Sequence, residues 1–322
     1  MASNFSSIWF ALFALAFGLV LLLFGGESLI SGATKLAKRL GMSPLLVGLT
    51  VVAFGTSVPE LFISINASIS GHPDIMFGNV VGSNIANIGL VLALSAILHP
   101  LPVLLNRLKN EFILLIVASV VLVAATLYGF FPRSLGCIFS VSLFAYTYFS
   151  YWAENKQKKA LKTGQPDENN EPLPSLVCIT FLCLAGLVLM WLGSEYFIDG
   201  AVDLARFIGL SELVIGLTLA AVGTSLPELA SSLSAIRKKE SDILVGNILG
   251  SNLFNLLWVL GLTAIIKPFD LPQDTLVRDL PVMVIFSVIL VPMALYQGKI
   301  NRFHGSILLA AYLGYIFVVG KG

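Results

Sequence analysis

The stretch that decides the fold is GMSPLLVGLTVVAFGTSVPELFISINASISGHPDIMFGNVVGSNIANIGLVLALSAILHP, residues 41–100. Shifted by 168 residues, it aligns without a gap on GLSELVIGLTLAAVGTSLPELASSLSAIRKKESDILVGNILGSNLFNLLWVLGLTAIIKP, residues 209–268. In this alignment 29 of 60 positions are identical, so the chain contains one unit used twice. Each copy carries a glutamate directly after a proline, inside a run of apolar residues.

The composition around these copies is that of a membrane protein. Hydrophobic residues make up 57% of the chain and charged residues 11%, with a mean hydropathy of +0.91. Soluble domains have about 25% charged residues. A net charge of +1 gives no reason to expect nucleic acid as a partner. The bilayer is therefore the expected surrounding, and the apolar runs predict ten membrane-spanning helices: residues 8–38, 43–70, 74–98, 109–129, 132–153, 175–207, 211–236, 241–266, 278–296 and 302–320.

A polar connector, residues 154–174, divides the chain into two halves of five predicted helices, residues 1–153 and 175–322. Because five is odd, the second half must cross the membrane in the opposite sense to the first. The predicted fold class is thus all-α, with ten transmembrane helices arranged as two inverted five-helix repeats. Inverted repeats of this kind are typical of secondary transporters, whose substrate site lies where the repeats meet.

Loop charges predict the orientation. Loops that follow odd-numbered helices collect fourteen Lys and Arg residues, whereas the opposite side has five. Basic loops stay in the cytoplasm. We therefore expect an integral protein of the plasma (inner) membrane with both termini on the non-cytoplasmic side.

The first polar motif in each copy is Gly-Thr-Ser-Val/Leu-Pro-Glu. Proline cannot donate the hydrogen bond that a helix needs at that position, so Pro59 and Pro227 predict a break. Carbonyl groups near Ala53 and Ala221 should then be free to face a ligand, because unwound backbone at membrane depth must line a cavity or be buried. Residues four apart share a helix face, which pairs Thr56 with Glu60 and, in the second copy, Thr224 with Glu228.

The second polar motif is Gly-Asn-x-x-Gly-Ser-Asn-x-x-Asn. It places Ser83 and Asn87 four residues apart, as it does Ser251 and Asn255. Together the motifs offer carboxylate, hydroxyl, amide and carbonyl oxygens, without thiolate or imidazole. Such a ligand set suits hard cations such as Ca²⁺, Mg²⁺ and Na⁺.

Glu60 and Glu228 give the strongest indication of a site. A carboxylate inside the membrane costs about 2.5–3.5 kcal/mol or more, and neither has a basic residue nearby in its own copy. A permanently protonated glutamate, or a pairing with a distant basic residue, is the structural alternative. The Ser, Thr and Asn residues could instead join helices by hydrogen bonds. Four further acidic residues are expected to face water or a vestibule: Glu27, Glu195, Asp199 and Asp203.

The paired motifs GTSVPE…GNVVGSNIAN and GTSLPE…GNILGSNLFN resemble the two alpha-repeats of the Ca²⁺/cation antiporter superfamily, in its sodium/calcium exchanger branch. The compact length resembles that of prokaryotic members. The resemblance implies a 5+5 inverted fold and exchange of three Na⁺ for one Ca²⁺, with two helices sliding across the other eight.

The resemblance also implies roles for individual residues. Glu60 and Glu228 would bind Ca²⁺ and share it with Na⁺, assisted by Thr56 and Thr224. Asn87 would reach the centre. The flanking Na⁺ sites would be completed by hydroxyls and carbonyls, those of Ser57, Ser83, Ser225, Ser251, Ala53 and Ala221.

Asn255 departs from a common family pattern. Many prokaryotic relatives and all potassium-dependent ones carry Asp there, so the amide favours a K⁺-independent cycle and resembles the animal exchangers. How Asn255 affects protonation or hydration of the central site is open.

The functional prediction is Na⁺/Ca²⁺ antiport. The nearest alternative is H⁺-coupled antiport of Ca²⁺ or another divalent cation, with Glu60 and Glu228 carrying the protons. A passive cation channel is a third reading. We expect no enzyme activity, no organic cofactor and no obligate protein partner; the ions are the transported substrates.

Overall fold

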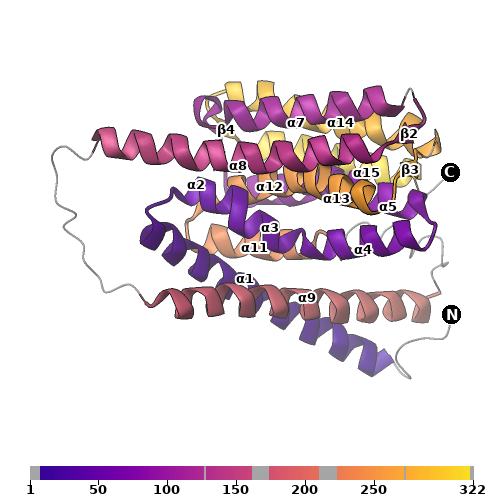
Figure 1. Cartoon of the computed structure of the whole chain (residues 1–322). Helices are drawn as coiled ribbons and strands as arrows, with labels where there is room; N and C mark the ends of the chain where they lie inside the picture. Colours follow the sequence, from indigo (N-terminus) through magenta and orange to yellow (C-terminus); the bar gives the residue numbers. More distant parts are fainter. Residues whose placement is uncertain (1–7, 127, 162–173, 210–222, 272, 320–322) are drawn as a thin grey trace.

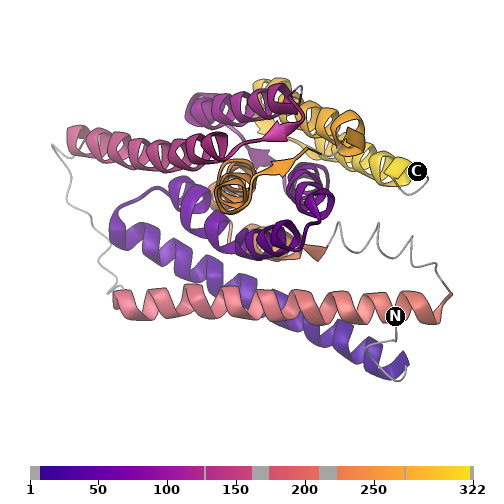
Figure 2. The same cartoon turned by 45° about the vertical axis from the view of Figure 1, so that its right-hand side comes forward.

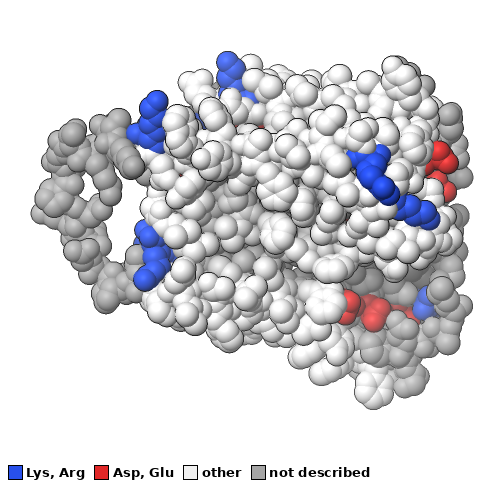
Figure 3. Space-filling view, viewed as in Figure 1, with Lys and Arg blue, Asp and Glu red and all other residues white. Residues whose placement is uncertain are grey.

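The computed structural model of the chain describes residues 8–126, 128–161, 174–209, 223–271 and 273–319. This part is almost entirely helical (Figures 1 and 2). Seven helices are long and apolar enough to cross a membrane, or eight if one bent pair counts as a single span. The protein is therefore an integral membrane protein. Charged side chains gather toward the two ends of the face in Figure 3, and few lie between them.

In the first half, α1 (Ile8–Leu40) is followed by a segment of four short helices: α2 (Pro44–Val47), η1 (Gly48–Val52), α3 (Ala53–Thr56) and α4 (Val58–Ile69). The next segment is α5 (Pro73–Ala86), η2 (Asn87–Leu92) and α6 (Ala93–Leu98). Then come α7 (Leu105–Thr126) and α8 (Arg133–Leu161). Helix α8 continues eight residues past the predicted end at 153, so the beginning of the predicted connector is helical.

In the second half, α9 (Leu176–Phe207) is followed by α11 (Leu226–Arg237). The first part of the predicted span 211–236 lies outside the described residues. Next is the segment α12 (Ser241–Leu253), η3 (Phe254–Val259) and α13 (Leu260–Ile266), which coincides with the predicted span 241–266. The chain continues with α14 (Gln273–Leu295) and α15 (Arg302–Val319).

Two short antiparallel ribbons join the halves at loops between helices. In one, β1 (Leu101–Pro102) pairs with β4 (Lys299–Ile300). In the other, β2 (Phe130–Phe131) pairs with β3 (Phe269–Asp270). Each ribbon takes one strand from each half. The two ribbons are equivalent when the halves are superposed in sequence, since β1 corresponds to β3 and β2 to β4.

Helices α1 and α9 cross along one side of the molecule (Figures 1 and 2). Their backbones touch at glycines: a Cβ on Gly18 would lie 2.6 Å from the Gly193 carbonyl oxygen, and one on Gly186 would lie 2.8 Å from that of Gly25. Real side chains essentially never approach so closely, so only glycine fits at these crossings. The pair packs against the rest of the molecule mainly through α11, with α1 also touching α2 and η1. The side chains of α5, η2, α12 and η3 are mostly buried and form the core.

Candidate cation-binding site

The two glutamates begin new helices directly after a break. Ser57 (φ −87°, ψ 2°) ends α3 and precedes α4, and the two parts of this span are bent by 43°. In the second half Ser225 (φ −93°, ψ 6°) precedes α11 in the same way. Proline at the start of each new helix suits a position where an N–H has no helical partner. The predicted breaks at Pro59 and Pro227 are confirmed.

Glu60 and Glu228 are both completely buried. None of their four carboxylate oxygens has a hydrogen-bond partner among the described residues, and no Lys or Arg there forms an ion pair with either. The two side chains are close enough for their charges to repel each other. Buried carboxylates without a partner are strongly unfavourable, so this pair requires a cation or protons.

Two hydroxyl pairs connect the halves beside the glutamates. Thr56 Oγ1 lies 3.2 Å from Ser251 Oγ, and Ser83 Oγ lies 3.1 Å from Thr224 Oγ1. The two pairs correspond under the 168-residue shift. Four of the predicted site residues are therefore brought together in two equivalent contacts.

Ser57 and Ser225 stand at the breaks themselves. Both are buried, and the hydroxyl oxygen of each lacks a hydrogen-bond partner within the described part of the chain. Their position next to the glutamates in sequence and their unused oxygens suit them to ligate an ion.

The predicted asparagines lie in π-helical turns, which often mark functional sites. Asn87 begins η2 and donates from Nδ2 to Asn252 Oδ1 at 3.1 Å, which leaves its own Oδ1 without a described partner. Asn255 lies in η3, and neither its Oδ1 nor its Nδ2 has a hydrogen-bond partner among the described residues. Each half thus supplies a buried amide oxygen that a cation could use.

The carbonyl of Ala53 is not free, contrary to the sequence prediction. It accepts a hydrogen bond from the Ser57 N–H at 3.0 Å, because the α3 turn continues to Ser57 before the chain bends, and a longer one from Thr56 Oγ1 at 3.4 Å. Ligation of an ion by the Ala53 carbonyl stays a prediction. Ala221 lies outside the described residues.

The first asparagine of each second motif was not predicted as a site residue. Asn79 Nδ2 donates to Ser64 Oγ at 2.9 Å and to the Glu60 carbonyl at 3.1 Å. Asn247 Nδ2 donates to Ser231 Oγ at 3.1 Å, and its Oδ1 accepts from Thr56 Oγ1 at 3.3 Å. These amides hold the broken helices in place. Their recurrence in both motifs was the available signal.

Four acidic residues were expected to face water, and for Asp203 this prediction is wrong. It is completely buried on α9 and pairs with Arg206 Nη1 at 3.2 Å. An arginine three residues along the same helix shares its face, which makes burial possible. Glu27 and Glu195 have exposed side chains and Asp199 a partly exposed one, and that they face water stays a prediction.

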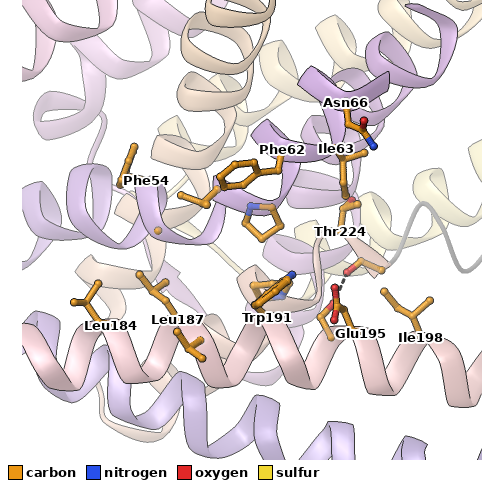
Figure 4. A pocket seen from close by; sticks show the side chains of 17 residues that line it. Phe54, Phe62, Ile63, Asn66, Leu184, Leu187, Trp191, Glu195, Ile198 and Thr224 are labelled. Atoms are coloured by element: carbon orange, nitrogen blue, oxygen red, sulfur yellow. Dashed lines mark hydrogen bonds between the residues drawn. The ribbon is translucent and has the colours of Figure 1, made fainter. Parts of the chain in front are cut away.

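A cavity of about 790 Å³ lies between α9 and the broken span of the first half. Figure 4 shows Phe54 and Phe62 on one side of it, and Leu187 and Trp191 of α9 on the other. At one edge are Gly223, whose carbonyl accepts a hydrogen bond from Ser194 Oγ at 3.0 Å, and Thr224. The cavity therefore extends to Thr224, which belongs to one of the two hydroxyl pairs.

The equivalent side of the other half is closed. The 168-residue shift relates α4 to α11, and α1 to α9. Helix α1 packs directly on α11, where a Cβ on Gly26 would lie 2.7 Å from the Ala230 carbonyl oxygen and 2.8 Å from Ser234 Oγ. Glu27 Oε1 lies 3.4 Å from Lys238 Nζ at the end of α11. The described structure is thus open on one of two equivalent sides.

The site offers a cation only oxygen ligands among the described residues, and two of these ligands are carboxylates. In the described part of the chain, His, Cys, Asp and Glu form no group of three that could hold a metal ion. Two carboxylates supplemented by hydroxyls and amides suit weakly bound, hard cations rather than zinc or copper. Fold and site together define a polytopic membrane protein with a buried pair of carboxylates among hydroxyl and amide oxygens, a candidate cation-binding centre.

Comparison with known proteins identifies its family. Residues 10–152 and 178–321 match the sodium/calcium exchanger protein family, and the chain belongs to it. It is 39% identical to the putative antiporter CaxA of Alkalimonas amylolytica, over 94% of this chain and 96% of that one. It is 37% identical to the inner membrane protein YrbG of Escherichia coli K12, over 84% and 85% of the two chains. A solved structure of the sodium-calcium exchanger NCX_Mj superposes with a TM-score of 0.80 at 31% identity, covering 97% of this chain and all of that one.

Proposed function

We propose that this protein is a secondary antiporter that exchanges Na⁺ for Ca²⁺ by alternating access. Its family supports cation exchange involving Ca²⁺. The observation that carries the Na⁺/Ca²⁺ assignment is the pair of buried glutamates without a hydrogen-bond or ion-pair partner in the described structure. Their charge of −2 is neutralised by one Ca²⁺, which two or three Na⁺ could replace, so the two ions compete for one centre and are carried in alternation.

The ligands in this proposal are the predicted ones. Glu60 and Glu228 bind both ions. The surrounding hydroxyl, amide and carbonyl oxygens complete the coordination: Thr56, Thr224, Ser57, Ser225, Ser83, Ser251, Asn87, Asn255, Ala53 and Ala221. Both carboxylates and both hydroxyl pairs come from one chain, which supports a site complete within a single copy.

The architecture we propose is ten spans in two inverted repeats. Two features of the described residues support it: the ribbons are equivalent under the sequence shift, and so are the Thr56–Ser251 and Ser83–Thr224 contacts. The basic loops support an inner-membrane orientation with both termini outside the cytoplasm.

Coupling to Na⁺ rather than H⁺ is favoured by the hydroxyl pairs. A proton needs only a carboxylate, whereas Na⁺ needs several neutral oxygens around it. The unpartnered carboxylates keep H⁺ coupling as the competing hypothesis, because protonation would also satisfy them.

The test is Ca²⁺ uptake into proteoliposomes loaded with Na⁺ at clamped internal pH. Wild-type uptake should require the outward Na⁺ gradient. Glu60→Gln and Glu228→Gln should each lower uptake by more than the about 10- to 100-fold typical of residues that only orient a metal ligand. Glu111→Gln is the matched control: Glu111 is a buried carboxylate outside the site that accepts a hydrogen bond from Tyr146, and its variant should keep uptake.

Uptake that follows a pH gradient and ignores Na⁺ would establish H⁺ coupling instead. Flux that needs neither gradient would make the protein a channel.

A 3:1 exchange also predicts a response to voltage. Three Na⁺ leaving for each Ca²⁺ that enters carry one net positive charge out of the vesicle. An inside-positive potential of 100 mV should favour uptake by about 2.3 kcal/mol per cycle. Clamping the potential with K⁺ and valinomycin measures this, and uptake indifferent to the clamp would contradict the stoichiometry.

A further inference from the structure

Glu195 lines the open cavity and has no assigned role in the ion site. It lies on α9, within a helix apolar enough to span the membrane, and its side chain is exposed. No Lys, Arg or His of the described residues forms an ion pair with it. A carboxylate placed in a membrane span without a partner is costly, so its presence needs an explanation.

The surroundings of Glu195 favour the approach of a cation. Among the described residues that line the cavity it is the one with an ionisable side chain, and the walls that they form are otherwise mainly apolar. Figure 4 shows it on α9 beside Ile198, with Thr224 above it on the facing segment. Thr224 in turn contacts Ser83, a residue of the proposed site. A single negative charge thus stands at a cavity that reaches the cation centre.

The repeat supplies a second, independent observation. The 168-residue shift places Glu195 on Glu27, the exposed carboxylate of α1. On that closed side the carboxylate lies 3.4 Å from Lys238 Nζ, and α1 rests on α11. The same position in the repeat therefore carries a carboxylate that has no ion pair among the described residues where a cavity exists, and that is paired with a cationic side chain where the helices touch.

We propose that Glu195 attracts cations from water into the open cavity, and that Glu27 does the same at the opposite membrane face once α1 separates from α11. While that side is closed, Lys238 forms an ion pair with Glu27 and takes the place of a transported ion. This inference rests on the proposed exchange function and extends it to the approach of the ion. Charge of one sign between low-dielectric walls focuses the field and raises the local concentration of counter-ions.

The test compares the two membrane faces. Ca²⁺ uptake is measured in right-side-out and inside-out vesicles, giving a KM and a kcat for each face. Glu195→Gln should raise the KM for Ca²⁺ at one face by about three- to tenfold and change kcat by less than about twofold, because steering alters encounter more than turnover. Glu27→Gln should raise the KM at the other face. Glu195→Asp keeps the charge and should restore the wild-type KM.

A KM unchanged at both faces in Glu195→Gln would overturn the inference, and so would an equal rise at both faces, which would make Glu195 part of the shared site. If Glu195→Gln does not insert stably, the wild-type KM decides: the inference requires it to rise with added choline chloride, which screens steering. Failure of the wild type to show Na⁺-dependent uptake would instead refute the proposed function itself.

Discussion

The two equivalent sides of the molecule differ in packing although the sequence repeat relates them. On one side α1 lies on α11 with backbone atoms in contact at Gly26. On the other side α9 and α4 face each other across a cavity of about 790 Å³. Segments related by the repeat thus adopt both arrangements within one chain, and the residues at the contact differ: the shift places Gly26 on Ser194 and Ala230 on Phe62. Two packings of similar stability are what an alternating-access cycle requires, since each side must be able to take the other's form.

The largest expected effect comes from preventing closure at Gly26. In Gly26→Leu the new side chain would clash with the Ala230 carbonyl, which is backbone and cannot move aside. Overpacking of this kind costs about 1–3 kcal/mol, so we expect Na⁺-dependent Ca²⁺ uptake to fall roughly 5- to 150-fold. A second substitution, Ser234→Cys, can be added to Gly26→Leu as a probe. Position 234 is buried beside Gly26, so its cysteine should become reactive toward a water-soluble maleimide when α1 cannot close on α11.

Gly314→Leu is the control, because a Cβ at Gly314 meets nothing within 4 Å. Equal losses in both variants would show that α1 and α11 do not need to touch.

An intermediate effect is expected from filling the open side. Val188 lines the cavity, so Val188→Trp should narrow it and lower uptake from that face about tenfold, corresponding to about 1.4 kcal/mol. Val177→Trp adds the same bulk on an exposed part of α9 away from the cavity and should have little effect. Sided uptake assays measure both, and unchanged uptake in Val188→Trp would show that ions approach by another route.

The smallest effect is expected from Lys238→Gln, which releases Glu27. Both side chains of this ion pair are partly exposed, so its contribution to the closed arrangement is within about 0–1 kcal/mol. Loss of the pair should favour opening of the closed side and lower the KM for Ca²⁺ there by up to about fivefold. A KM that rises at that face would mean that Lys238 helps the ion to approach rather than blocking it.

Much of the helical layout could be predicted from sequence because apolar runs and prolines act locally. The segment 241–266 and the breaks before Glu60 and Glu228 follow from hydropathy and from the missing proline N–H. The repeat alignment also identified in advance the residues that form the two hydroxyl pairs. These features depend on neighbours in the chain or on the comparison of one copy with the other.

The remainder depends on contacts between distant segments. Asp203 was expected to face water because it lies on the polar half of a span, and its burial follows from how α9 packs. The π-helical turns at Asn87 and Asn255 carry no special residue that would separate them from an ordinary helix. Which side is open could not be predicted from the sequence alone. The copies differ at the contact, where Ser194 and Phe62 stand in place of Gly26 and Ala230, but the effect of these larger residues depends on how the helices pack.

The two ribbons have a consequence for synthesis of the chain. Leu101 and Pro102 hydrogen-bond to Lys299 and Ile300, which leave the ribosome almost 200 residues later. At about 5–20 residues per second, these loop residues wait roughly 10–40 s for their partner strand. The first half therefore spends that time in the membrane without the strands that complete its loops. Its carboxylate Glu60 also waits, since Glu228 and the hydroxyls of Thr224 and Ser251 belong to the half that is made last.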